Sequence, residues 1–198
     1  MRIREWHVVI SGFQQKSGNV NGMTQIWLDL IALTKDKPEV RVELLTWRDD
    51  IENMAELISR LSPELESPAV YVYGYSWGGQ TALNFAQALR RRSIRVMHMV
   101  LADPVYRAAR FLFFFWLFQW RAFAGFVFLR VPTTVREVTW FRQREDYPRG
   151  HDLKADNDGL TIIHDAVELT TGHAWMDDHV DFRKACRDVC QAAGKGEF

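Results

Sequence analysis

The stretch VYVYGYSWGGQTAL, residues 70–83, contains the strongest structural signal in the sequence. Its valine and tyrosine run up to Tyr75 is typical of a buried strand, and a helical pattern starts directly after Ser76. Gly74 and Gly78 flank the serine, where the chain must turn sharply and backbone segments approach closely. Such a turn projects the serine side chain above the C-terminal edge of a sheet. A plain glycine-serine turn is the alternative, but the position between strand and helix favours a nucleophile.

The same alternation of strand and helix runs through the first half of the chain. The apolar runs show little polar alternation, as expected for strands buried on both faces of a parallel sheet. Between them lie helical patterns, one of which opens with Asp49 and Glu52 spaced as a capping box. This order predicts a three-layer α/β fold with right-handed crossovers. The expected strands are 6–13, 40–47, 69–75 and 95–103, and the expected helices are 23–35, 49–61 and 78–92.

The second half of the chain is less regular. Residues 104–131 form a strongly aromatic segment, and the following pattern indicates a strand over 134–143 and a polar loop over 144–159. A last strand is expected over 160–169 and a closing helix over 177–193. No repeat and no linker divides the sequence. We therefore expect one α/β domain over residues 1–198, with a lid-like aromatic insertion at about 105–131.

Composition limits the function classes. The 198 residues are 47% hydrophobic and 25% charged, with 25 basic and 25 acidic residues, so the charge does not favour a nucleic-acid partner. Cys186 and Cys190 lie four apart, which favours small apolar side chains on one helix face over a disulfide framework or a zinc site. No cofactor and no metal are predicted. The N-terminus has no apolar stretch of signal-peptide length, so a cytoplasmic location is expected.

A serine hydroxyl needs a base, and the base needs an orienting acid. His173, in TTGHAWM, follows the last expected strand, in a loop from which an imidazole can reach Ser76. This order of serine, acid and histidine is the one found on this kind of fold. His173 is therefore the predicted base. The other histidines fall before or within strands, in the loop before the last strand, or in the closing helix: His7, His98, His164, His151 and His179.

Two positions compete for the acid. Asp103, in VLADPV, ends the strand that follows the serine strand, so adjacent strand ends would bring it to the same edge as Ser76. Four acids follow the next strand instead, which is the commoner place for the acid in this kind of enzyme, although they lie in a charge-rich loop that could be merely solvated. We favour Asp103. The four competitors are Glu145, Asp146, Asp156 and Asp158.

Residues GYSWGGQTALNFAQALRRRSIRVMHMVLAD, together with GHAWM, resemble the α/β-hydrolase superfamily, and within it the thioesterase and small lipase-like branches. The resemblance covers most of the chain. It implies a catalytic triad of Ser76, Asp103 and His173, with Met176 in the matching late motif. The chain departs from that pattern in being shorter than most thioesterases. Its first loop also reads SGFQQKSGNVNG, residues 11–22, where the family has a glycine-rich loop.

Two backbone N–H groups are the predicted oxyanion donors. The helix after the serine begins at Trp77, so its first unpaired N–H groups would face the group that Ser76 attacks. The second donor would come from the first loop, from Phe13 or, as second choice, Gln14.

The aromatic segment FLFFFWLFQWRAFAGFVFL, residues 111–129, is close to membrane-spanning length, but Gln119 and Arg121 near its middle argue against a span. It lies where many members of the superfamily insert a lid. Four interpretations stay open: core helices over the sheet, a lid lining an acyl pocket, a peripheral membrane contact, and the contact of a homodimer. The predicted pocket and lid residues are Phe111, Phe114, Phe115, Phe118 and Trp175.

These features predict a serine hydrolase that cleaves acyl esters or thioesters through an acyl-enzyme, with a small-molecule or lipid-like acyl substrate. One alternative is a lipase or cell-envelope esterase acting at a membrane surface. Another is a catalytically inactive hydrolase-fold binding module, which would have no need of Ser76, Asp103 and His173 together.

Overall fold

The computed structural model of the protein describes residues 2–13, 15, 20–62, 67–106, 128–157 and 159–195. In this part of the chain, a seven-stranded sheet has the order β2-β1-β3-β4-β6-β8. The seventh strand, β9, pairs with the last residues of β6, after the residues of β6 that pair with β8. Every pairing in the sheet is parallel. The strands are β1 (Glu5–Ser11), β2 (Val40–Thr46), β3 (Ala69–Tyr75), β4 (Val96–Ala102), β6 (Val135–Arg142), β8 (Ile162–Ile163) and β9 (Val167–Glu168).

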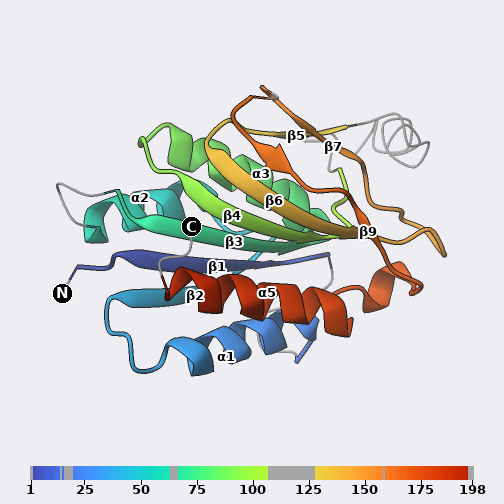
Figure 1. Cartoon of the computed structure of the whole chain (residues 1–198), viewed down its shortest axis with the longest axis horizontal. Coiled ribbons are helices and arrows are strands. Elements are labelled where there is room, and N and C mark those ends of the chain that lie inside the picture. Colours follow the sequence, from blue (N-terminus) through green and yellow to red (C-terminus); the bar gives the residue numbers. More distant parts are fainter. Residues whose placement is uncertain are drawn as a thin grey trace.

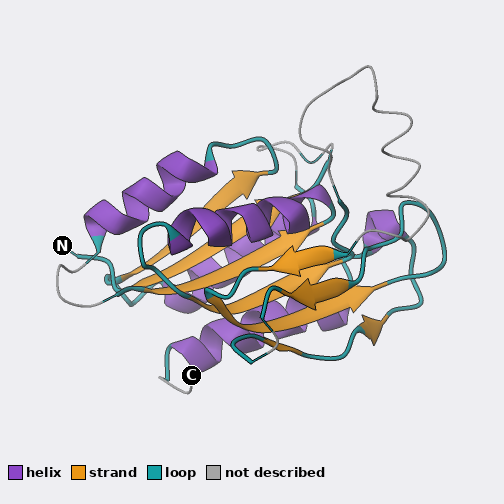
Figure 2. Cartoon of the chain, turned by 90° about the horizontal axis from the view of Figure 1, so that it is seen from above, coloured by secondary structure: helices purple, strands orange, loops and turns teal. Residues whose placement is uncertain are grey.

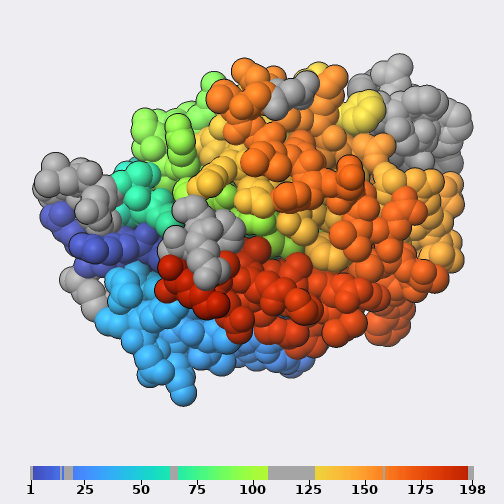
Figure 3. Space-filling model, viewed as in Figure 1, coloured from blue at the N-terminus to red at the C-terminus, as the bar shows by residue number. Residues whose placement is uncertain are grey.

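Helices cover both faces of this sheet, so the predicted three-layer α/β fold is confirmed (Figures 1 and 2). Helices α1 (Gly22–Thr34) and α5 (Val180–Ala193) lie on one face, and α2 (Ile51–Leu61) and α3 (Trp77–Arg90) lie on the other. Figure 3 shows α5, in red, lying against α1, in blue.

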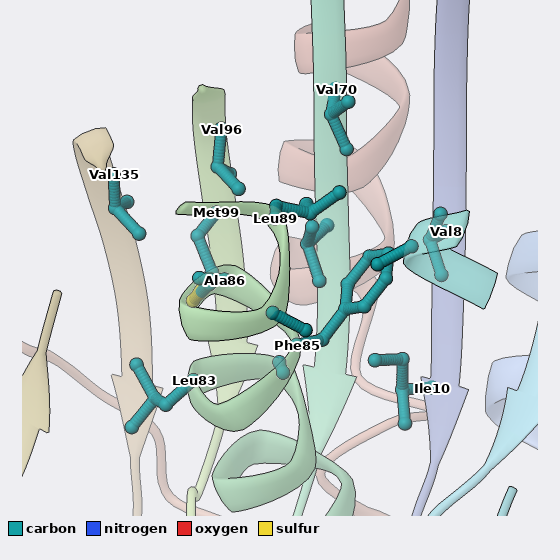
Figure 4. Close-up of a cluster of buried hydrophobic side chains, with 14 of the residues drawn as sticks. Val8, Ile10, Val70, Leu83, Phe85, Ala86, Leu89, Val96, Met99 and Val135 are labelled. Carbon is teal, nitrogen blue, oxygen red and sulfur yellow. The ribbon is translucent and has the colours of Figure 1, made fainter. Parts of the chain in front are cut away.

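Successive side chains of the central strands enter two separate cores. Val8 and Met99 face α3, where they pack with Phe85 (Figure 4). Val9 and Val100, each the next residue along its strand, face α1 and α5 instead. Both faces of the strands are therefore buried, which explains why their sequences are apolar throughout rather than alternating with polar residues.

The chain after β4 is more irregular than the sequence predicts. The expected polar loop 144–159 contains β7 (Leu153–Ala155), which pairs in parallel with β5 (Leu129–Val131) in a small second sheet. The single strand expected over 160–169 is instead divided into β8 and β9, because the chain leaves the β6 ladder between them. There Trp140 Nε1 donates a hydrogen bond to the carbonyl of His164 at 2.9 Å. Three-residue strands carry too little sequence pattern to be recognised.

The predicted capping box at Asp49 is wrong by one residue. Asp50 is the N-cap of α2, and its carboxylate accepts hydrogen bonds from the N–H groups of Glu52 and Asn53 at 3.0 and 3.1 Å. Asp49 accepts instead from the N–H of Thr46 at 2.5 Å. Asp49 thus closes the turn after β2, which leaves the next aspartate to cap the helix.

The closing helix also begins later than expected. His179 is not inside it but is the N-cap of α5, where its ring accepts a hydrogen bond from the Asp181 N–H at 3.3 Å. Cys186 and Cys190 both lie on α5 as buried free thiols. Burial raises the pKa of both thiols, the Cys190 pKa to about 12, so these cysteines act as small apolar side chains in the core below α5.

Most of the aromatic segment lies outside the described residues, which resume at Phe128 after Tyr106. The predicted lid at about 105–131 and the membrane or homodimer contact through 111–129 therefore stay predictions. Within the described ranges, no helix has the length and apolar character needed to cross a membrane. The predicted positions outside the described residues are Gln14, Phe111, Phe114, Phe115, Phe118 and Asp158.

Candidate active site

Ser76 occupies a strained turn between β3 and α3. Its backbone has φ 54° and ψ −123°, a left-handed conformation that L-residues rarely adopt. Backbone and side-chain atoms pack closely around the glycines on both sides of the turn. A Cβ at Gly78 would lie 2.3 Å from the carbonyl oxygen of Ile10, and one at Gly74 would lie 3.1 Å from the carbonyl oxygen of Gly78. The two glycines therefore permit the turn that presents the Ser76 side chain.

The structure brings Ser76, His173 and Asp103 into one hydrogen-bonded chain. His173 begins a short 3₁₀ helix, η1 (His173–Trp175), after β9. Its Nε2 lies 2.9 Å from the Oγ of Ser76, and its Nδ1 lies 2.5 Å from Oδ2 of Asp103. A hydroxyl, an imidazole and a carboxylate in this order can move a proton from the hydroxyl oxygen to a ring whose other nitrogen is fixed.

The Asp103 carboxylate is fully buried and held by donors from the segment after β6. Its Oδ1 accepts hydrogen bonds from the Gly150 N–H at 2.8 Å and the Gln143 N–H at 3.3 Å, and its Oδ2 accepts from the Gln143 amide at 3.0 Å. Sequence reasoning missed Gln143 and Gly150. The available signal was that Gln143 directly follows β6, the strand next to β4 in the sheet.

Asp146, a competing candidate for the acid, contacts the backbone of His173 rather than its ring. Its Oδ1 accepts the His173 N–H at 2.6 Å, and the Tyr75 hydroxyl donates to the His173 carbonyl at 2.7 Å. Burial raises the pKa of Tyr75 far above its usual range, which keeps this hydroxyl a donor. The peptide of His173 is thus anchored on both sides. Glu145 and Asp156 are exposed on the surface.

The two predicted oxyanion positions adjoin the serine. Trp77 is the first residue of α3, so its N–H belongs to the group that the helix itself leaves unpaired. On the other side, Gly12 packs directly on the serine, because a Cβ at Gly12 would lie 3.0 Å from Cβ of Ser76. Phe13 follows it in the chain. Donation by these two N–H groups to a substrate stays a prediction.

An aromatic cluster of Phe13, Trp47 and Trp77 lies beside this loop. The Phe13 and Trp77 ring centroids are 4.4 Å apart, and the Trp47 ring is 4.8 Å from Trp77 and 5.8 Å from Phe13. Phe13 is 46% exposed, so the cluster presents apolar surface next to the serine. Trp47 was not predicted, because it belongs to the turn after β2 and only the fold brings it here. Trp175, a predicted pocket residue, is 65% exposed on η1.

Comparison with solved structures finds distant likenesses. An esterase from the archaeon Pyrobaculum calidifontis is 15% identical with a TM-score of 0.49, covering 96% of this chain and 76% of that one. The surfactin thioesterase domain SrfTE is 13% identical with a TM-score of 0.49, covering 96% and 91%. The NocB thioesterase domain of the nocardicin cluster is 15% identical with a TM-score of 0.47, covering 98% and 95%. At these values the likenesses are too distant to bear on activity.

Comparison with curated proteins finds no match. A family model, in contrast, covers most of the sequence. The model described as "Alpha/beta hydrolase family" matches residues 22–193, a range that contains Ser76, Asp103 and His173. The match agrees with the parallel sheet, the helices on both its faces and the strand-turn-helix at Ser76, and it supports a hydrolase role. The chain belongs to the alpha/beta hydrolase family.

Proposed function

We propose that the protein is a serine hydrolase that cleaves acyl esters or thioesters through an acyl-enzyme formed on Ser76. One observation carries this proposal: Ser76 Oγ, both ring nitrogens of His173 and the buried Asp103 carboxylate form a continuous chain with distances of 2.9 and 2.5 Å. An inactive binding module would have no use for a strained serine aligned on an imidazole in this way.

In the proposed mechanism, Ser76 Oγ attacks the acyl carbon while His173 Nε2 takes the hydroxyl proton. Asp103 stabilises the imidazolium and keeps the Nδ1 proton directed toward itself. The developing oxyanion would be met by the Trp77 and Phe13 N–H groups. His173 then gives its proton to the leaving alcohol or thiol as the carbonyl re-forms. Water, deprotonated by the same nitrogen, releases the acid and restores the serine.

The proposal is tested by covalent labelling. A fluorophosphonate reacts with an activated serine by forming a bond from Oγ to phosphorus, with loss of fluoride. We expect the wild-type protein to gain one label by intact mass, with peptide mapping to Ser76. Ser93→Ala, which changes an exposed serine after α3, is expected to label like wild type, and Ser76→Ala is expected not to label. Absence of labelling in the wild type, together with no ester hydrolysis, would identify the inactive module instead.

The aromatic cluster beside Ser76 supports an apolar acyl group as the substrate's main recognition element. Each methylene that leaves water on binding contributes about 0.8 kcal/mol, or roughly fourfold in an equilibrium constant. We therefore expect kcat/KM for p-nitrophenyl octanoate to exceed that for the acetate by about tenfold or more. Trp47→Ala is expected to reduce this ratio. Equal rates on both esters would contradict an acyl-binding surface, and a rate increase on adding liposomes would favour the membrane-surface esterase.

A further inference from the structure

A second buried carboxylate lies four residues after His173 and has no part in the proposed proton transfer. Asp177 is 1% exposed, and its Oδ2 accepts hydrogen bonds from the Gln15 side-chain amide at 2.5 Å and from the Met23 N–H at 3.2 Å. Burial, with a smaller effect from the Asp178 charge, raises its pKa to about 6. Keeping an ionised carboxylate buried in this way lowers the stability of the fold, which indicates a role for Asp177 beyond packing.

Gln15 connects this carboxylate to the loop that lies on the serine. The side-chain Oε1 of Gln15 accepts the Gly12 N–H at 3.0 Å, and the backbone N–H of Gln15 donates to the Gly12 carbonyl at 3.3 Å. Gly12 is the residue packed on Ser76, and Phe13 follows it. One side-chain amide thus bridges Asp177 and the Gly12–Phe13 turn, and its two ends have opposite hydrogen-bonding polarity.

The start of α1 fixes Asp177 from the other side. A Cβ at Gly22 would lie 2.5 Å from the carbonyl carbon and oxygen of Asp177 and 2.7 Å from its carboxyl carbon, so only glycine fits between them. If Asp177 served only to bind a free N–H group at the start of α1, the hydrogen bond from Met23 would be enough. The N-cap of α1 is in fact Asn21, whose side chain accepts the Thr24 N–H at 3.0 Å. The bond to Gln15 is therefore additional to what the helix needs.

We propose that Asp177 is a positioning residue that acts through Gln15 to hold the Gly12–Phe13 turn over Ser76. The inference rests on the proposed function, because the turn matters to catalysis only if the Phe13 N–H meets a substrate oxyanion. Asp177 also follows η1, so one side chain fixes the oxyanion side of the site relative to His173. Displacement of a catalytic group by about 1 Å can cost about 100-fold in rate.

Exchanging the donor and the acceptor of the hydrogen bond between Gln15 and Asp177 tests this role. In Gln15→Glu, a carboxylate oxygen replaces the amide nitrogen that faces Asp177. At about pH 9, where the two carboxylates no longer share a proton, two acceptors oppose each other, and we expect kcat to fall about 10- to 100-fold with KM changed less than about twofold. Adding Asp177→Asn places a donor where Oδ2 accepted from both Gln15 and Met23, so the bond to the new glutamate is restored and the bond from Met23 is lost. We expect the loss of the Met23 bond to lower the melting temperature rather than kcat. We expect the double variant to recover kcat to within about threefold of wild type.

A control and an independent readout complete the experiment. Asn21→Ala removes the α1 cap without touching the bridge, and we expect a lower melting temperature with unchanged kcat. Hydrogen exchange of the peptide containing Gly12 measures the bridge whether or not the protein is active. We expect faster exchange in Gln15→Glu and wild-type exchange in the double variant. Unchanged exchange in Gln15→Glu, or altered exchange with unaltered kcat, would overturn the inference. If the wild-type protein had no esterase activity while the exchange rates of the two variants were as expected, the proposed function alone would be refuted and the hydrogen-bonded bridge would stand.

Discussion

The Ser76→Ala variant is expected to lose about 10⁴-fold or more in kcat/KM for p-nitrophenyl esters, because the acyl-enzyme can no longer form. The fold should survive the change. The Ser76 hydroxyl hydrogen-bonds to the His173 ring, and alanine tolerates the turn's φ of 54° about as well as serine does. Steady-state kinetics alongside circular dichroism and thermal melting measure both effects.

Loss of the base, His173, is expected to be as damaging as loss of the nucleophile. His173→Ala is expected to cost as much as Ser76→Ala, and the double variant no more than either single variant, because residues that act as a unit are strongly non-additive. His164→Ala serves as a control. This histidine is exposed between β8 and β9, where it pairs with Glu137 at 2.6 Å, and its loss should leave turnover unchanged. Multiplicative losses in the double variant would contradict a shared proton-transfer step.

The core of the fold could be read from the sequence because each signal was strong and local. Buried parallel strands produce uninterrupted apolar runs, and β3 begins and ends where its run of valine and tyrosine predicts. The glycines around Ser76 reflect close backbone contacts that substitution would disrupt, so they too leave a trace in the sequence. These signals were sufficient to predict that Ser76, Asp103 and His173 lie at one edge of the sheet.

What could not be predicted depends on contacts between distant segments. Gln143 supports Asp103 across 40 positions of the chain, and Gln15 bonds to Asp177 across 162. A glutamine in a polar stretch has the same local appearance whether it is solvated or buried against a carboxylate. Trp47 likewise joins Phe13 and Trp77 only through the order of strands in the sheet. Residues that position a site are therefore harder to find than those that react.

Replacing the buried acid gives the second large effect. Asp103→Asn is expected to lower kcat/KM by about 10³- to 10⁴-fold, because an amide that donates to Nδ1 of His173 stabilises the tautomer whose Nε2 carries a proton and cannot accept one from Ser76. The asparagine has no good alternative orientation. Its amide nitrogen would face the donors of Gln143 and Gly150 on one side, or the Gln143 side-chain amide and the ring on the other.

Gln143 cannot turn to relieve this conflict, since its Oε1 already accepts the Asp146 N–H at 2.9 Å. We therefore also expect Asp103→Asn to lower the free energy of unfolding by about 1–3 kcal/mol, the cost of leaving a buried donor unpaired. Asp146→Asn is the matched control, with the same change of charge on the other side of His173. Its retained oxygen can still accept the His173 N–H, so we expect less than about a tenfold loss of rate. If Asp146→Asn were the inactive variant and Asp103→Asn the active one, the orienting acid would lie after β6 rather than after β4, and the proposed proton path would be wrong.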